Sequence, residues 1–141
     1  MPAAARSILG LDVGTRRIGV SAASLEARLP RPLITLLFDD TFFGALETIV
    51  EVEGVELMVV GFPRNLRGHH TAQTEAIESF TAQLRQHFAM PIHFQDEAVT
   101  SKHAEAELKA RGKPYDKGDI DSLAATYILE DFLAENKELV S

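Results

Sequence analysis

The first forty residues alternate between apolar positions and small or polar ones, a pattern typical of β-strands. An apolar run at 8–13 ends in a Gly14-Thr15 turn, and a period of two resumes at 18–23. A third apolar run at 33–38 follows two prolines. Consecutive strands joined by short turns pair antiparallel, so this part of the chain predicts a three-stranded antiparallel unit.

From residue 39 onward, apolar residues at helical spacing alternate with short, nearly continuous apolar runs, which indicate buried strands. We first expect a helix that is capped by Asp39, Asp40 or Thr41 and ends at Gly54, and then a strand at 56–61. A helix from about Thr71 to 88 and a strand at 91–95 should follow. The chain should end with a helix capped by Thr100 or Ser101 and stopped by Gly112, and a last helix from Asp119 to about 134. These elements predict an α/β fold. Its mixed five-stranded sheet has three antiparallel strands followed by two parallel ones, with helices on both faces.

Composition narrows the class of protein. With 141 residues, 45 % of them hydrophobic, the chain suits one domain over 1–141, and we expect 1–6 and 136–141 to be flexible tails. No apolar stretch approaches the ~20 residues that cross a membrane, and no secretory signal is readable, so we expect a cytoplasmic protein with no membrane partner. The absence of cysteine excludes disulfides and thiol-ligated metal sites.

The net charge of −7 argues against broad, sequence-blind binding of nucleic acid by a basic surface. It does not exclude a nuclease, because metal-binding carboxylates add negative charge at the site itself.

Three carboxylates lie where an ordinary surface charge is not expected. Asp12 interrupts the first apolar strand, Asp121 begins the apolar stripe of the last helix, and Glu97 follows the last predicted strand. A cation, a metal ion or hydrogen bonds could compensate Asp12. Asp121 could instead interact with the helix dipole, and Glu97 could be a plain loop carboxylate. If the three converge, their oxygens suit Mg²⁺ or Mn²⁺, ions that support phosphodiester cleavage.

Four segments, in the correct order, resemble motifs of one known family. They are the opening strand and turn at 8–20, the loop at 61–68, the segment at 96–101 and the start of the last helix at 121–129. On these motifs the chain resembles the YqgF family, also called RuvX, of Holliday junction resolvases. The resemblance implies a ribonuclease H-like fold and a metal-dependent nuclease. Such a nuclease would act in ribosome biogenesis, by processing precursor 16S rRNA, or in the resolution of branched DNA.

The resemblance also implies which residues act. The acidic triad of the family carries over to Asp12, Glu97 and Asp121, which would be catalytic and would ligate Mg²⁺ or Mn²⁺. We expect the flanking segments to contact nucleic acid through Arg16, Arg17, Arg64, Asn65, Arg67, Thr100 and Lys117. The chain departs from the family pattern at Ala98, where relatives often have Arg, and in the loop 113–118, which is less basic.

Two other functions stay open at this point. The turn at 12–15 also resembles the phosphate loop of the actin and sugar-kinase superfamily, which would indicate an ATP-binding phosphotransferase-like domain, although that superfamily uses two such domains. A non-catalytic module that binds nucleic acid or the ribosome would keep the same fold. The sequence does not choose between RNA and DNA, or between a monomer and a homodimer.

Overall fold

A mixed sheet forms the centre of the computed structural model, which describes residues 6–64, 70–98 and 100–140. In these residues the sheet has the strand order β3-β2-β1-β4-β5. The strands are β1 (Ser7–Val13), β2 (Arg17–Ser24), β3 (Arg31–Leu37), β4 (Val55–Pro63) and β5 (Ile92–Glu97). β2 pairs antiparallel with β1 and β3, whereas β4 pairs parallel with β1 and β5. The predicted arrangement of three antiparallel and two parallel strands is therefore confirmed.

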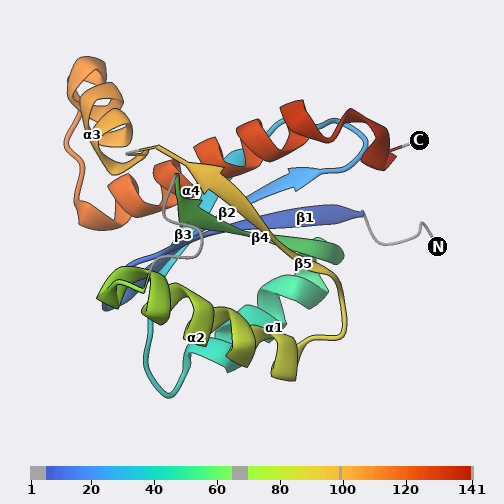
Figure 1. Ribbon diagram of the computed structural model, residues 1–141. Coiled ribbons are helices and arrows are strands. Elements are labelled where there is room, and N and C mark those ends of the chain that lie inside the picture. Colours follow the sequence, from blue (N-terminus) through green and yellow to red (C-terminus); the bar gives the residue numbers. More distant parts are fainter. Residues whose placement is uncertain (1–5, 65–69, 99, 141) are drawn as a thin grey trace.

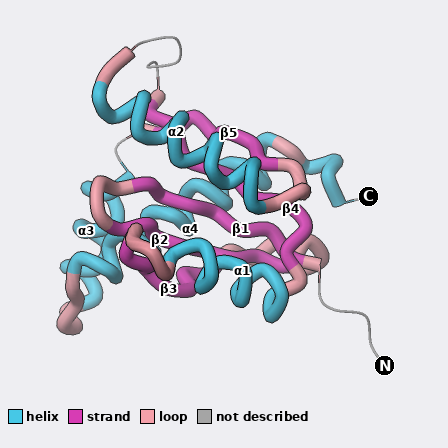
Figure 2. Tube along the Cα trace, turned by 90° about the horizontal axis from the view of Figure 1, so that it is seen from below, coloured by secondary structure: helices cyan, strands magenta, loops and turns pink. Residues whose placement is uncertain are grey.

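Helices cover both faces of the sheet, as predicted (Figures 1 and 2). One face carries α1 (Phe42–Glu53) and α2 (Ala72–His87); the other carries α4 (Lys117–Glu135), against which α3 (Thr100–Arg111) packs. A short 3₁₀ helix, η1 (Lys137–Val140), follows α4. In the described part of the chain, no helix is both long enough and apolar enough to cross a membrane.

Strand periodicity divides the core into two layers. In β1, Leu9 and Leu11 point into the cluster beneath α1 and α2, whereas Ile8 belongs to the cluster beneath α4. Because successive side chains of a strand point to opposite faces, Gly10 and Asp12 lie on the α4 face with Ile8. The α4 face therefore holds the first of the three acids singled out by the sequence.

Helix α4 is hydrogen bonded to strands across the width of the sheet. The Thr35 hydroxyl on β3 donates to the Gly118 carbonyl at 2.6 Å, and Ser21 on β2 donates to the Ala125 carbonyl at 2.7 Å. At the far end, Gln95 Nε2 on β5 donates to Glu135 at 2.7 Å. One helix thus lies over both outer strands of the sheet.

The predicted start of the last helix was wrong by three residues. Asp116 is the N-cap, and α4 begins at Lys117. Asp116 accepts from the Asp119 backbone N–H at 2.9 Å, while the Asp119 side chain accepts from the Asp116 N–H at 3.0 Å. The two acids form a reciprocal capping box, so Asp119 belongs to the first turn of the helix and is not its cap.

Other boundaries differ less. Gly54 and Gly112 end α1 and the α3 segment with positive φ angles of 65° and 70°, as predicted. Thr100 and Ser101, the alternative caps, both lie inside α3, and β5 continues as far as Glu97. This longer β5 makes Glu97 a strand residue.

The predicted flexible tails fall partly outside the described residues. Within them, Arg6 forms an ion pair with Glu56 at 2.5 Å, and its carbonyl accepts from the Leu25 N–H. At the other end, Asn136 Nδ2 donates to the Phe132 carbonyl at 2.8 Å. The flexibility of the two ends stays a prediction.

Candidate nuclease site

Asp12 is held beside the backbone of α4 by a glycine on the neighbouring strand. Asp12 pairs in register with Gly19 across β1 and β2. A Cβ atom on Gly19 would lie 2.0 Å from the Asp121 carbonyl oxygen, so only glycine allows α4 to approach this closely. The β1–β2 turn is closed by the Gly14 N–H, which donates to the Arg17 carbonyl at 2.9 Å. Because Gly19 has no side chain, α4 packs close enough to β2 to bring Asp121 next to Asp12.

Glu97 reaches the same face of the sheet from the last residue of β5. It pairs with Pro63 in the parallel register of β4 and β5, two positions beyond the pair of Gly61 and Gln95. Its side chain is buried, with 7 % of the residue exposed, whereas Asp96 is exposed on the opposite face. In the described part of the chain, the buried Glu97 Oε1 has no hydrogen-bond partner. A buried acceptor left unpaired is costly, and such an atom in a native structure indicates a ligand or a strained site.

One cavity joins the two acids. It encloses about 510 Å³, and its lining includes Asp12, Glu97, Arg64 and Ile128. Gly61, on the strand between the two acids, leaves the space into which Ile128 fits, because a Cβ there would lie 2.4 Å from Ile128 Cδ1. The cavity therefore lies at the carboxyl ends of β1, β4 and β5, where open α/β sheets place their sites.

Both carboxyl groups hold their protons more tightly than usual. Burial raises the pKa of Asp12 to about 7, and the negative charge of Asp121 adds to the shift. Burial also raises the pKa of Glu97 to about 8, with further contributions from a hydrogen bond between the Glu97 and Asp131 carboxyl groups and from the Asp131 charge, while Arg64 acts in the opposite direction. Uncompensated carboxylates raise one another's pKa in this way, and a divalent cation would reverse the effect.

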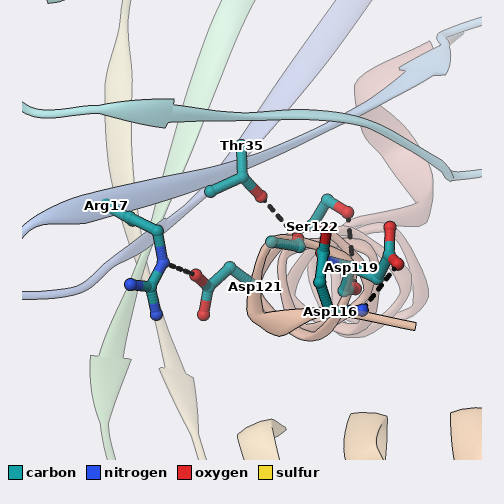
Figure 3. Close-up of polar contacts among 7 residues, drawn as sticks. Arg17, Thr35, Asp116, Asp119, Asp121 and Ser122 are labelled. Atoms are coloured by element: carbon teal, nitrogen blue, oxygen red, sulfur yellow. Dashed lines mark hydrogen bonds and ion pairs between the residues drawn. The ribbon is translucent and has the colours of Figure 1, made fainter.

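The third acid lies next to Asp12 but faces another partner. Asp121 is partly buried on α4, and its Oδ2 accepts from Arg17 Nε at 2.8 Å. Figure 3 shows this carboxylate pointing toward the guanidinium group. Asp121 does not line the cavity that Asp12 and Glu97 share. Among the described residues, no group of three or more His, Cys, Asp or Glu side chains is arranged to hold a metal ion.

The structure therefore brings Asp12 and Glu97 together and sets Asp121 at the edge of the same region. The donor chemistry of the first two still suits a hard divalent cation, because both supply carboxylate oxygens and Glu97 Oε1 is unpaired among the described residues. The role of all three as ligands stays a prediction.

Among the described residues predicted to contact nucleic acid, Arg64 lines this cavity. Arg16 and Lys117 are exposed, Arg17 is partly buried against Asp121, and Arg64 is exposed at the cavity lining. Asn65 and Arg67 lie outside the described residues. Thr100 is the first residue of α3, and its side chain lies outside the described part. The contacts that these residues make with nucleic acid stay predictions.

Sequence reasoning missed Asp131. It lies on α4 beside Glu97 and lines a second cavity of about 470 Å³, which also includes Arg64, Glu107 and Tyr127. The Tyr127 hydroxyl donates to Glu107 at 2.5 Å and links α4 to α3 in this region. The sequence does contain one indication of its position. Asp131 comes three residues after Ile128, which belongs to the apolar stripe of the last helix, and residues three apart lie on the same side of a helix.

Comparison with known proteins identifies the family. The model of the family "RuvX: Holliday junction resolvase" matches residues 6–135. A relative from Chloroflexus aggregans, named "Putative pre-16S rRNA nuclease", is 40 % identical over 132 residues, covering 91 % of this chain and 93 % of the relative. A relative of the same name from Synechocystis is 34 % identical over 129 residues, covering 89 % and 85 %.

Solved structures agree on the fold. RuvC from T. thermophilus, in complex with a Holliday junction substrate, superposes with a TM-score of 0.53 at 15 % identity, covering 92 % of this chain and 95 % of that one. At this identity the likeness shows the fold alone, and it confirms the predicted ribonuclease H-like architecture. Resolvases and nucleases of this fold generally use divalent metal ions. The sequence match over nearly the whole chain establishes that this protein belongs to the RuvX family of Holliday junction resolvases.

Proposed function

We propose that this protein is a divalent-metal-dependent nuclease that hydrolyses phosphodiester bonds at the cavity between Asp12 and Glu97. The observation that carries the proposal is the buried Oε1 of Glu97, unpaired among the described residues, in the cavity that Asp12 also lines. Two carboxyl groups with raised pKa values that line one cavity are typical of a functional site, and their oxygens suit a divalent cation.

Each residue has a separate task in this proposal. Asp12 and Glu97 hold the metal ion, and Asp121 completes the ligand set from α4. Arg16, Arg64 and Lys117 are exposed cations that bind phosphate groups of the nucleic acid. Asn65, Arg67 and Thr100 add polar contacts from the neighbouring segments.

Mg²⁺ or Mn²⁺ is the cofactor that this donor set favours, since both are hard ions that prefer carboxylate oxygens. When bound, the ion polarises the phosphate and lowers the pKa of a water molecule, which is the chemistry that the protein side chains alone lack. The protein contributes the binding of the phosphate backbone, the position of the carboxylates and a partly enclosed cavity.

The substrate favoured by the relatives' names is the precursor of 16S rRNA, which would place the protein in the cytoplasm and in ribosome biogenesis. Branched DNA is the second candidate, because the description of the matching family is that of a Holliday junction resolvase. A junction resolvase cuts two strands symmetrically and needs a homodimer, whereas an RNA-processing nuclease can act as a monomer.

The test is cleavage of a precursor 16S rRNA fragment and of a four-way DNA junction, side by side, with Mg²⁺, with Mn²⁺ and with chelator. We expect metal-dependent cleavage of the RNA by the wild-type protein. Asp12→Asn and Glu97→Gln should each reduce the cleavage rate by at least about 100-fold, because each removes a charged ligand of the ion.

The matched control is Asp96→Asn. Asp96 is the neighbour of Glu97 on β5, but it is exposed on the other face, so its replacement should leave the rate within about twofold. Circular dichroism of each variant checks the fold. Cleavage of DNA but not RNA would select the resolvase. If neither substrate is cut, or if Asp12→Asn cuts as fast as wild type, the proposal is wrong and a non-catalytic binding module becomes the better description.

A further inference from the structure

The ion pair between Arg17 and Asp121 joins two residues that the proposed site needs for different purposes. Arg17 Nε donates to Asp121 Oδ2 at 2.8 Å, and the two side chains are 38 % and 19 % exposed. In the part of the chain that the structure describes, Nε is the only Arg17 side-chain atom in a hydrogen bond. Neither terminal amino group of the guanidinium makes a hydrogen bond to a described residue, and Figure 3 shows one of them turned away from the carboxylate, where it can bind another anion.

The backbone around Asp121 is fixed, so the choice of partner rests with its side chain. The Asp121 carbonyl packs against Gly19, and the hydrogen bonds of Thr35 to Gly118 and of Ser21 to Ala125 hold the helix before and after it. Asp12 is close enough for the Asp121 charge to raise its pKa. A rotation of the Asp121 side chain is thus a smaller change than any movement of α4.

We propose that Arg17 is a positioning residue, which holds Asp121 off the metal ion until a phosphate of the nucleic acid binds the guanidinium group. This inference rests on the proposed function. Arginine pairs with phosphate as readily as with carboxylate, and its planar group can contact both during the exchange. Once the phosphate binds the Arg17 guanidinium, the Asp121 carboxylate is free to rotate toward Asp12 and to complete the ligand set.

The proposal makes metal and nucleic acid binding cooperative. In the free protein, the metal ion competes with Arg17 for Asp121, which lowers its affinity. Bound nucleic acid removes this competitor, so nucleic acid raises the affinity for metal and metal raises the affinity for nucleic acid by the same factor. The site would therefore bind the metal ion weakly until nucleic acid is present.

The test measures the binding of Mn²⁺ by the electron paramagnetic resonance signal of the free ion, which requires no catalysis. It compares the wild-type chain with Arg17→Gln, Arg16→Gln and Arg31→Gln. Without nucleic acid, Arg17→Gln should bind Mn²⁺ about three- to fivefold more tightly, the effect of removing one partly exposed competing ion pair.

The two control variants distinguish the effect of breaking the Arg17–Asp121 ion pair from the effect of removing one positive charge. Arg16→Gln removes the same charge next to Arg17 but breaks no bond with Asp121. Arg31→Gln breaks an ion pair of similar length, 2.9 Å to Glu53, at the other end of the β2–β3 pair. Neither should tighten Mn²⁺ binding as Arg17→Gln does. Arg17→Lys, which keeps the charge but loses the guanidinium, should give an intermediate result and serves if Arg17→Gln does not fold.

The same titration is repeated with a short phosphorothioate oligonucleotide, which resists cleavage. The oligonucleotide should tighten Mn²⁺ binding in the wild type and in Arg31→Gln, and by a clearly smaller factor in Arg17→Gln. If Arg17→Gln and Arg17→Lys bind Mn²⁺ no more tightly than the wild type, Arg17 does not compete and the inference is overturned. Failure of the proposed function looks different, because Mn²⁺ binding would then be absent or unaffected by Asp12→Asn.

Discussion

At the scale of single residues, the ionised forms of Asp12 and Glu97 lower the stability of the folded, metal-free protein. Both are carboxyl groups in or beside an apolar layer, and burial is the main cause of their raised pKa values. The folded protein holds their protons more tightly than the unfolded chain does, which means that ionising them costs stability. A site that binds a cation strongly is expected to carry this cost, since function and stability compete for the same residues.

Replacing Asp12 by asparagine should therefore stabilise the metal-free protein in a pH-dependent way. Asp12 titrates near 3.8 when unfolded and near 7 when folded, so the stability linked to its proton is full below the lower value and lost as the pH rises through the upper one. The asparagine side chain does not titrate, so the variant keeps its stability over this range. In a thermal melt with chelator, Asp12→Asn should raise Tm by about 5 °C above pH 7 and by little near pH 4.

Glu78→Gln is the control for this experiment, because Glu78 is an exposed carboxylate on α2 that does not line the cavity. It should leave Tm unchanged at both pH values. A gain in Tm for Asp12→Asn that is equal at low and high pH would contradict the assigned pKa, because the gain would then come from something other than the proton.

At the scale of elements, the site depends on how closely α4 lies on the sheet. Three strand glycines leave the room that the helix occupies, and a Cβ at Gly10, Gly19 or Gly61 would meet an atom of α4 within 2.8 Å. At Gly19 that atom is a backbone oxygen, which cannot rotate away, whereas at Gly61 it is the end of the Ile128 side chain. Gly19 is therefore the strand position at which an added side chain would disturb the packing of α4 most.

Gly19→Ala should destabilise the protein by about 3 kcal/mol, because α4 must shift to make room for one methyl group. Gly44→Ala is the matched control. Gly44 lies in α1 with no atom within 4 Å of the added Cβ, so alanine should stabilise by about 0.5–1 kcal/mol through its higher helix propensity. Urea unfolding measures both. Equal effects of the two substitutions would show that the contact of α4 with β2 is loose.

At the scale of the whole molecule, an acidic protein is expected to bind nucleic acid through a few local cations. The net charge is −7, yet Arg16, Arg64 and Lys117 are exposed, and Arg64 lines the cavity. The acids of the second cavity, among them Glu107 and Asp131, would repel a phosphate backbone. We expect the nucleic acid to follow the arginines and to avoid this acidic side.

Removing one of these cations should change the salt dependence of binding as well as the affinity. Each phosphate that a cation neutralises contributes about 0.7–0.9 to the slope of log K against log salt, so Arg16→Gln and Arg64→Gln should each reduce the slope by nearly one unit. The measurement is fluorescence anisotropy of a labelled single-stranded RNA in chelator. Arg31→Gln, at the other end of β2 and β3, should leave the slope unchanged. An equal reduction for all three variants would mean that the protein has no local phosphate site.

The amino-acid sequence by itself determined the order and type of the elements, because hydrophobic periodicity and glycine stops are local properties of the chain. It also singled out Asp12 and Glu97, since a charge inside or beside an apolar strand is visible without tertiary contacts. The helix cap was placed wrongly because Asp116 and Asp119 are both suitable caps, and only their reciprocal hydrogen bonds decide which one begins the helix.

Only the tertiary structure decided the partners of the side chains. The sequence placed Asp121 on the helix stripe that packs on the sheet and left open whether it meets the other two acids; in the structure its carboxylate is bound to Arg17, 104 residues away along the chain. The proximity of Asp131 to Glu97, and the burial that leaves Glu97 Oε1 without a partner among the described residues, likewise arise where α4 meets β5. Periodicity gives the face of a helix on which a residue lies. It does not give the direction of the side chain, which depends on which distant charge the packed fold brings within reach.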